Sequence, residues 1–499
     1  ILSNVSAYEA AINLAYDTTF DVDGDLTCAW MEQNYDWSNQ TFRSRAVESL
    51  NLAVNYLTDV LHTLYLDAKT WTVDDDGPAD FHTIQEAINA ASPGDIIYVY
   101  NGTYYEWVIV NKSVSLIGDE LAKPTITTNA TKSTVYISAN NVTVSGFEIQ
   151  NSMLEDLGIF SIFLNHSSNS IIYGNVVKGL YAIRVEGGSG NKISNNCVAR
   201  LWDPSCVFSG FQLGNSDNNV VTDNYFGEYC HDTFVMYNSN HNYIAFNYIA
   251  GHFSYFPFTI YNSNNNSIVG NAIWGAICYL QQGGHIKVSQ SHGNAFCHNS
   301  FLLSHGYPLP EPRFVEVLID DNSMNNTWDN GYPSGGNYWD DYNGTDLYSG
   351  PSQNETGSDG IGDTLYILNT YNHDNYPIMG SLSTFDAGTW NGISYNVDVV
   401  SNSTVSDFYF NPDEGPFLRF NATGSNGTTG FSRVAIPKQL LWVEDGWTVL
   451  VDNEPVIPTV IKDANYTYLY ITYNHSTRTV QVIGTHVIPE FPSTLTLLL

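Results

Sequence analysis

The chain has 499 residues, which is too long for one ordinary compact domain unless that domain is a repeat solenoid. Its net charge of −34 comes mainly from missing base, because only 17 Lys and Arg stand against 51 Asp and Glu. Phosphate binding needs clustered Lys and Arg, so the composition argues against nucleic acid as a partner, and cations should instead be attracted.

Residues 1–70 are predicted to be a helical N-terminal segment. Apolar residues between Thr41 and Leu66 recur every three or four positions, which gives a helix one continuous apolar stripe. Either Asn39 or Thr41 could cap its start. The stripe consists of Phe42, Ala46, Leu50, Ala53, Leu57, Val60 and Leu64.

Residues 71–119 change character. After a turn-rich acidic stretch, Ile84, Ala87, Ile88 and Ala91 form one face of a short helix that ends at 93–94 (Pro-Gly). Three strand-like runs follow, IIYVY, WVIV and VSLIG.

A repeat with a period in the twenties follows and predicts a solenoid, in which each coil buries its inner face by stacking on the next. One Asn recurs in each period, and a second polar corner precedes it, as in SSNS, SDNN and SNNN. Asn tolerates left-handed turns and bonds neighbouring amides, so stacked Asn side chains should form a ladder. The recurring residues are Asn151, Asn175, Asn196, Asn224, Asn247, Asn271 and Asn299.

The pattern gives way at 331–380 to GNYW, DGIGD and DNYP strings. These strings and the 71–119 segment resemble the NosD-like family of right-handed parallel β-helix proteins, and the resemblance covers about residues 71–380. It implies that the short helix caps one end of the solenoid. The same family has been linked to copper handling.

Alternating runs from about residue 384, such as YNVDVV, FLRFNAT and YTYLYITY, predict a C-terminal antiparallel β-sandwich. The segment ending in IPEFPS resembles a module of archaeal secreted proteins, where that string precedes a membrane or sorting tail. The predicted fold is mainly β, and its predicted parts are 1–70 (helical), 71–383 (parallel β-helix with helical cap and Asp/Gly-rich closing segment), 384–487 (β-sandwich) and 488–499 (tail).

Two acidic clusters are candidate calcium sites, because calcium prefers oxygen ligands. The first occupies positions 1, 3, 5 and 12 of a calcium loop, although Leu26 stands where the loop needs Gly; a solvated acidic turn is its alternative. The second lies in the Gly-rich closing segment, where a polar connector is the alternative. The clusters are Asp21, Asp23, Asp25 and Glu32, and Asp340, Asp341, Asp346, Asp359 and Asp363. Asp74, Asp75 and Asp76 fit a turn and helix-capping element better.

Histidines could support copper, but no His-x-His pair or Met cluster occurs, and adjacent Cys and His residues on a strand point to opposite faces. No motif for haem or nucleotide is present. The candidate histidines are His231, His241, His252, His285, His292, His298 and His305. Six cysteines allow up to three disulfides, with buried thiols as the alternative: Cys28, Cys197, Cys206, Cys230, Cys278 and Cys297.

Sixteen N-x-S/T sequons span the chain and predict a glycosylated extracellular protein of the cell surface. They begin at Asn4, Asn39, Asn101, Asn111, Asn129, Asn141, Asn165, Asn265, Asn325, Asn343, Asn354, Asn402, Asn421, Asn426, Asn465 and Asn474. Residue 1 reads as a mature N-terminus, and the apolar tail as the stub of a C-terminal membrane or sorting attachment.

No coherent catalytic constellation emerges, because the proximity of Asp223, Glu228 and Asp232 in the sequence is weak evidence for a hydrolase pair, and a solvated coil corner explains them better. The sequence therefore predicts a non-enzymatic structural protein of the archaeal cell envelope, such as a surface-layer, sheath or filament subunit or an adhesin. Its partners would be copies of itself, other envelope proteins and glycans. The alternatives are a carbohydrate-binding or carbohydrate-active surface protein and, less favoured, a copper-handling protein.

Overall fold

The computed structural model describes residues 36, 38–47, 54, 68–129, 131–151, 158–199, 209–229, 233–251, 256–275, 284–303, 315–390 and 392–488. In these ranges no helix combines the length and the apolar character needed to cross a membrane. Of the predicted N-terminal helix, residues 40–47 are helical, and Asn39 caps them because its Oδ1 accepts from the Thr41 N–H at 2.8 Å. The rest of that segment lies outside the described residues.

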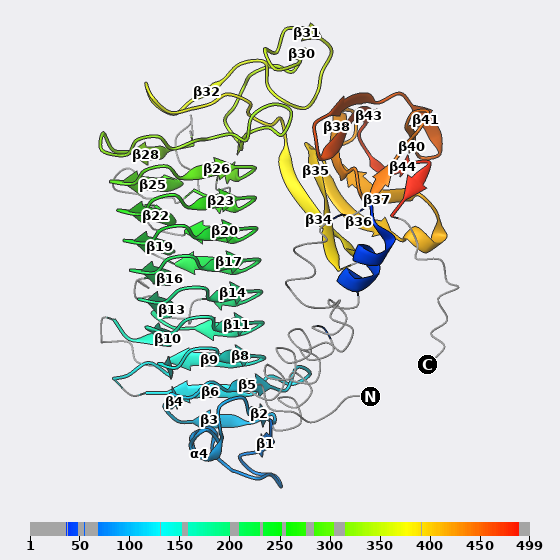
Figure 1. Ribbon diagram of the computed structural model, residues 1–499. Coiled ribbons are helices and arrows are strands. Elements are labelled where there is room, and N and C mark those ends of the chain that lie inside the picture. The colour runs from blue at the N-terminus through cyan, green and yellow to red at the C-terminus, as the bar shows by residue number, and fades with distance from the viewer. Residues whose placement is uncertain are drawn as a thin grey trace.

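The body of the molecule is a parallel β-helix of three sheets, which confirms the predicted fold (Figure 1). From β2 to β28, each coil contributes one strand to each sheet in the order 1, 2, 3. Sheet 1 contains β1 (Thr70–Val73), β2 (Ile96–Val99), β5 (Ser115–Gly118), β8 (Thr143–Ser145), β11 (Ile171–Tyr173), β14 (Lys192–Ser194), β17 (Val220–Thr222), β20 (Tyr243–Ala245), β23 (Ser267–Val269) and β26 (Ala295–Cys297). Sheet 2 contains β3 (Thr103–Tyr105), β6 (Thr125–Thr128), β9 (Glu148–Asn151), β12 (Val176–Lys178), β15 (Cys197–Ala199), β18 (Tyr225–Tyr229), β21 (Tyr248–Gly251), β24 (Ala272–Trp274), β27 (Ser300–Leu302) and β29 (Tyr338–Trp339). Sheet 3 contains β4 (Val108–Val110), β7 (Val135–Ile137), β10 (Phe160–Asn165), β13 (Tyr181–Glu186), β16 (Ser209–Gly214), β19 (Phe234–Tyr237), β22 (Phe258–Tyr261), β25 (Ile286–Ser289) and β28 (Val317–Ile319).

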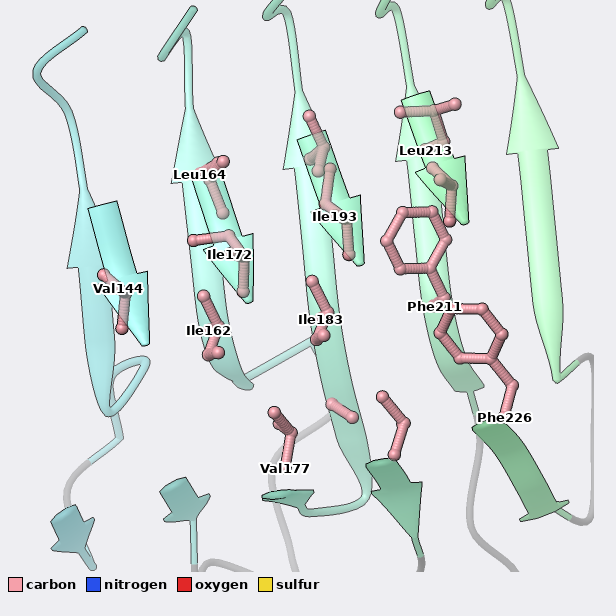
Figure 2. Packing of buried hydrophobic residues seen from close by; sticks show 14 of the residues in the cluster. Val144, Ile162, Leu164, Ile172, Val177, Ile183, Ile193, Phe211, Leu213 and Phe226 are labelled. Carbon is pink, nitrogen blue, oxygen red and sulfur yellow. The ribbon is translucent and has the colours of Figure 1, made fainter. Parts of the chain in front are cut away.

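Short strands suffice because nearly all of them bury one to three apolar side chains in a common interior. Val144, Ile172 and Ile193 on successive strands of sheet 1 are fully buried and meet residues from the other two sheets (Figure 2). Alternate residues on each strand face outward, so the outer faces of the sheets carry the polar and half-exposed side chains.

The corner between sheets 1 and 2 is held by the predicted ladder of stacked Asn side chains. In each step one Oδ1 accepts both the backbone N–H and the Nδ2 of the Asn one coil earlier, as Asn247 does from Asn224 at 3.0 Å each. Members are at most 2% exposed. The ladder comprises Asn175, Asn196, Asn224, Asn247, Asn271, Asn299 and Asn337.

The ladder differs from the prediction at both ends. Asn151 does not belong to it, because the register pairs Val176 with Glu148 and thus places Phe147, not Asn151, one coil before Asn175. At the other end the ladder continues to Asn337 in the closing segment.

The corner between sheets 3 and 1 carries a second buried ladder at the second predicted polar corner. It comprises Asn191, Asn219, Asn242, Asn266, Asn294 and Asn326, beside a row of stacked serines. The connections at this corner are 166–170, 187–191, 215–219, 238–242, 262–266 and 290–294, always five residues.

Both ends of the solenoid are covered. Helix α4 (Ile84–Ala90), with Thr83 as N-cap, buries the predicted face at one end. At the other, Trp328 stacks on Phe296 at 4.2 Å, and Trp339 lies between Phe301 and Tyr366 at 4.3 Å from each. The closing segment also forms two short ribbons, β30 (Tyr348–Ser349) with β31 (Glu355–Thr356) and β32 (Tyr366–Ile367) with β33 (His373–Asp374).

The C-terminal part consists of two five-stranded antiparallel sheets that share one hydrophobic core. Sheet 4 contains β34 (Ser381–Trp390), β35 (Ile393–Ser401), β38 (Thr429–Pro437), β43 (Tyr466–Asn474) and β42 (Thr459–Lys462). Sheet 5 contains β36 (Thr404–Phe410), β37 (Phe417–Thr423), β44 (Thr477–Ile483), β40 (Thr448–Val451) and β41 (Glu454–Val456), with the 3₁₀ helix η1 (Pro412–Glu414) between β36 and β37. A ribbon of β39 (Leu441–Trp442) and β45 (His486–Val487) completes this part.

Sheet 4 packs on the closing segment of the solenoid. Arg433 on β38 is 2% exposed, donates from Nη2 to the carbonyl of Pro333 and lies 4.2 Å from the ring centroid of Tyr468. Ile378, Val400 and Phe431 form a small apolar cluster at the same junction. The two parts are therefore joined through buried contacts.

The structure of the ladder predicts that removal of a buried Asn side chain lowers the free energy of unfolding far more than removal of an exposed one. Asn247→Ala leaves the N–H and Nδ2 of Asn224 without their acceptor, and we expect the free energy of unfolding to fall by about 3 kcal/mol. Denaturant titration followed by circular dichroism measures it.

The matched control is Asn262→Gly. Asn262 is exposed, bonds the Asn238 side chain at 2.7 Å and has φ of 45°, a value that Gly tolerates. We expect a loss below about 1 kcal/mol, and equal losses for the two variants would contradict the role given to the buried ladder.

Candidate functional site

The outer face of sheet 3 carries a polar cluster built by three neighbouring coils. In the register, Asn165 on β10, Glu186 on β13, Gly214 on β16 and Tyr237 on β19 follow one another along one row. Arg184 stands two residues before Glu186 and points to the same face because side chains alternate along a strand.

The cluster is a closed hydrogen-bond network. Arg184 Nη2 donates to Glu186 Oε2 and to the Tyr237 hydroxyl oxygen, both at 2.8 Å. The Tyr237 hydroxyl donates to the same Oε2 at 2.6 Å, and Asn215 Nδ2 donates to Oε1. Each member is therefore fixed by at least one other before any ligand arrives.

Gly214 makes this network possible. A Cβ at position 214 would overlap the Tyr237 hydroxyl and the Glu186 carboxylate. Without it, the Tyr237 side chain lies across the intervening coil and reaches Glu186, two coils away.

The network keeps Glu186 ionised. Although partial burial acts to raise it, the hydrogen bonds from Tyr237, Arg184 and Asn215 hold the pKa of Glu186 below its usual value. Burial and the bond to Glu186 raise the pKa of Tyr237 to about 12. The side chains of Arg184 and Glu186 remain 28% and 17% exposed, so a ligand can reach a charged pair that is already partly desolvated.

Aromatic rings adjoin the network on the same face. Arg184 lies 5.5 Å from the ring centroids of both Phe160 and Phe163, and Phe163 meets Tyr136 edge-on at 5.6 Å. Tyr261, next after Tyr237 in the row, is 44% exposed. The face thus offers rings beside fixed hydrogen-bonding groups.

The connections between sheets 2 and 3 are the variable ones. They range from two residues at 179–180 to fourteen at 303–316, whereas the other two corners keep two and five residues from 166 to 299. Length variation confined to one edge of a regular scaffold is typical of an edge that carries function. Sheet 3 borders this edge, and its strand β13 begins right after a two-residue connection.

The carboxylates that a hydrolase could have used, Asp223, Glu228 and Asp232, cannot be described as one group. Asp223 is exposed at a two-residue corner with φ of 58°. The side chain of Glu228 and the whole of Asp232 lie outside the described residues.

The five acidic residues of the closing segment are not gathered into one cluster. Asp340 accepts from the N–H of Leu303 at 3.0 Å and Asp341 from that of Val315 at 2.9 Å, so both tie the segment to the solenoid. Asp346 accepts from the N–H groups of 359 and 360 at 2.9 and 2.8 Å.

Asp359 accepts from the Ile361 N–H at 3.0 Å, and Asp363 accepts from the N–H groups of Leu347 and Tyr348 at 2.9 and 3.0 Å. Each of the five carboxylates thus fixes backbone. A calcium ion in this segment stays a prediction, and the other predicted calcium cluster, Asp21 to Glu32, lies outside the described residues.

Asp74, Asp75 and Asp76 are the one group of three or more possible metal ligands found together in the described ranges. Asp74 accepts from the Gly77 N–H at 3.0 Å and Asp75 from the Thr103 N–H at 3.0 Å. Asp74 thus forms the turn expected from the sequence, whereas Asp75 bonds a residue of β3, and the expected helix cap is supplied by Thr83 instead.

Within the described residues, no candidate histidine belongs to a group of three or more possible metal ligands. His285 is buried, with Nδ1 accepting from the Glu316 N–H at 3.3 Å and Nε2 donating to the Leu302 carbonyl at 2.9 Å, and burial lowers its pKa to about 4. His292 Nδ1 accepts from the Met324 N–H at 3.2 Å, and His298 Nε2 lies 3.1 Å from the Ser334 carbonyl. His231, His252 and His305 lie outside the described residues.

Cys197 and Cys297 are free thiols, and burial raises the pKa of Cys297 to about 11. The other four cysteines lie outside the described residues. The fifteen sequon asparagines other than Asn4 are all exposed or half-exposed, so an attached glycan would reach solvent; their glycosylation stays a prediction.

The fold and the ladder place the chain among parallel β-helix proteins. More narrowly, it belongs to the NosD family, since the family model described as periplasmic copper-binding protein (NosD) matches residues 88–344. No curated protein sequence matches the chain.

Solved structures resemble the chain only distantly. Pectate lyase Pel9A is 14% identical over 53% of this chain and 80% of its own, with a TM-score of 0.38. The Dettilon tailspike protein gp208 is 13% identical over 84% of this chain and 94% of its own, with a TM-score of 0.34. Pectin methylesterase from Aspergillus niger is 14% identical over 47% and 85%, with a TM-score of 0.28. Such values say nothing about the activity of this chain.

The pH dependence of stability provides a test of the predicted calcium site in the closing segment. Burial, together with the neighbouring carboxylates Asp359 and Asp363, raises the pKa of Asp346 to about 6. A carboxyl whose pKa is raised by folding stabilises the fold at low pH, and this contribution is lost as pH rises from about 4 to about 6. Without calcium, we expect the free energy of unfolding of Asp346→Asn, relative to that of wild type, to rise by about 1–2 kcal/mol between pH 4 and pH 7.

The comparison with wild type is needed because buried, neutral His285 makes the free energy of unfolding change with pH in the opposite direction. This contribution is the same in both proteins and cancels in their difference. Thermal unfolding at a series of pH values measures the difference. If calcium chloride, but not magnesium chloride, raises the melting temperature of wild type at pH 7 and has no such effect on Asp346→Asn, the segment binds calcium.

Proposed function

We propose that this protein is an extracellular β-helix protein that binds neutral glycans on the outer face of sheet 3. The observation that carries the proposal is the preformed network of Arg184, Glu186, Asn215 and Tyr237 on that face. A carboxylate and a guanidinium held side by side can exchange hydrogen bonds with neighbouring sugar hydroxyls, one accepting and one donating.

The rings beside the network supply the apolar half of such a site. Sugars present C–H faces between their hydroxyls, and aromatic side chains bury such faces while their edges stay wet. Tyr136, Phe163 and Tyr261 lie along the same sheet face as the network. The network itself has no net charge, which suits a neutral glycan.

The same geometry favours binding over hydrolysis. A general acid must carry a proton near neutral pH, whereas Glu186 has a pKa below its usual value because three donors hold its ionised form. Tyr237, with a pKa of about 12, stays protonated and serves as a donor.

The structural envelope role predicted from the sequence stays a prediction. Simple end-to-end stacking of solenoids into a filament is disfavoured by the caps, because α4 and the Trp328 and Trp339 stacks cover the coil ends. Assembly through other surfaces remains compatible with glycan binding.

Glu186→Gln tests the site directly. Loss of the charged acceptor should weaken binding of a neutral oligosaccharide, found first on a glycan array, at least about tenfold by calorimetry. The control is Glu148→Gln on sheet 2, where Glu148 pairs with Lys178 at 2.7 Å and both side chains are 31% exposed. Equal affinity of the two variants, or no neutral glycan bound by wild type, would remove the proposal.

Gly214→Ala tests the geometry without replacing a charged group. The added Cβ should displace the Tyr237 ring and crowd the Glu186 carboxylate, and should therefore weaken binding to a similar extent. Denaturant unfolding checks that the variant remains folded. Unchanged affinity would show that Tyr237 plays no part in binding.

A further inference from the structure

The C-terminal part contains a pocket of about 610 Å³ far along the chain from the sheet 3 site. Its volume lies within the usual range of small-ligand pockets, about 300–1,000 Å³. Strand β39 contributes Trp442, and strands β35 and β42 of sheet 4 contribute Tyr395 and Lys462. The remaining lining residues used below lie in connections between strands. Six lining residues carry the argument: Tyr395, Lys438, Gln439, Trp442, Trp447 and Lys462.

Three of these residues are aromatic. The Trp442 ring is held in place by His486, which stacks on it at 5.4 Å with an interplanar angle of 8°. The Tyr395 hydroxyl donates to Gln439 Oε1 at 3.3 Å. Trp447 adds a second indole to the lining, and its Nε1 is a buried donor without a partner in the described part of the chain.

Two of the six are lysines, in a chain with 17 basic residues among 499. No acidic residue is among the described lining residues. The nearby Asp463 turns its carboxylate to its own loop, where it accepts from the N–H groups of Asn465 and Tyr466 and from the Tyr468 hydroxyl, each at 2.7 Å. Lys438 Nζ donates to the Asp463 carbonyl, and its charge also acts on the Asp463 carboxylate.

We propose that this pocket binds a sugar residue that bears a carboxylate, such as a uronic acid at the end of an acidic glycan. The rings contact the C–H face of the sugar, Gln439 bonds its hydroxyls, and Lys438 and Lys462 contact the carboxylate. The net charge of −34 does not prevent this, because at physiological salt repulsion is screened beyond about 8 Å. The site is independent of the sheet 3 face and takes a ligand of different charge.

The test uses the full chain, with oligogalacturonate and its methyl ester as probes, since they are the same sugar with and without charge. By calorimetry, we expect the acid to bind at least about tenfold more tightly than the ester, and added sodium chloride to reduce that difference. Equal affinity for acid and ester, or no saturable binding of either, would overturn the proposal.

Two variants locate the site. Lys462→Gln, a change at an exposed side chain, should weaken binding of the acid about tenfold and leave the ester unaffected, whereas Trp442→Ala should weaken both. Lys192→Gln, at an exposed lysine of sheet 1, is the charge control and should change nothing. Should Trp442→Ala fail to fold, Lys462→Gln alone decides, and its full affinity for the acid would overturn the proposal.

Arg184→Ala separates the two sites. It should abolish binding of neutral glycans at sheet 3 and leave the affinity for oligogalacturonate as in wild type. Loss of oligogalacturonate binding in Arg184→Ala would place the acidic sugar on sheet 3 and overturn the assignment of the pocket.

Discussion

The pairing of buried side-chain amides is the constraint on which this structure depends. A buried Asn without partners costs more than its burial returns, so each coil must stack in the one register that gives its amide both an acceptor and a donor. The column is directional, because each Nδ2 donates to the next coil. Its last member, Asn337, has no further Asn to accept from its N–H and Nδ2, and the carboxylate of Asp374 accepts from both instead. The same carboxylate oxygen also accepts from Trp339 Nε1 at 2.9 Å.

The same rule operates on the surface and produces the candidate site. An exposed column of amides runs in the opposite direction, from Asn262 to Asn238 to Asn215, and ends on Glu186. Glu186 is thus held by the scaffold from one side and by Arg184 and Tyr237 from the other. A ligand meets groups whose positions are already determined, so little ordering entropy opposes binding.

Much of the solenoid could be predicted from the sequence because its signals are local. The spacing of Asn175 to Asn299 follows from the ladder, and the apolar face of 84–91 follows from helical periodicity. The exception, Asn151, fell within the expected spacing by chance, since only strand register distinguishes it from Phe147. Sequence motifs identify the closing segment, but they do not predict that Asn337 continues the ladder, because that role depends on pairing with Asn299 far away in the chain.

The candidate site could not be predicted in the same way. Arg184 and Tyr237 are 53 residues apart, and the connections between sheets 2 and 3 vary too much in length for counting to align them. The weak signal available was Gly214, a glycine at a strand position, which marks a close approach by another group. The pocket of the C-terminal part was equally hidden, because Tyr395, Trp442 and Lys462 come from three separate strands.

The junction between the β-helix and the C-terminal part fixes the sheet 3 site and the C-terminal pocket relative to each other. Arg433 is buried there and has lost its hydration, which the carbonyl of Pro333 and the ring of Tyr468 replace only while the two parts stay in contact. The junction therefore resists the hinge motion that a flexible linker would allow. Two sites on one rigid body add to avidity only for a glycan long enough to span them, and a shorter one gains nothing from the second site. A polymer that carried both neutral and acidic sugars would engage both proposed sites at once, and the fixed distance between them would then set the length that this polymer needs.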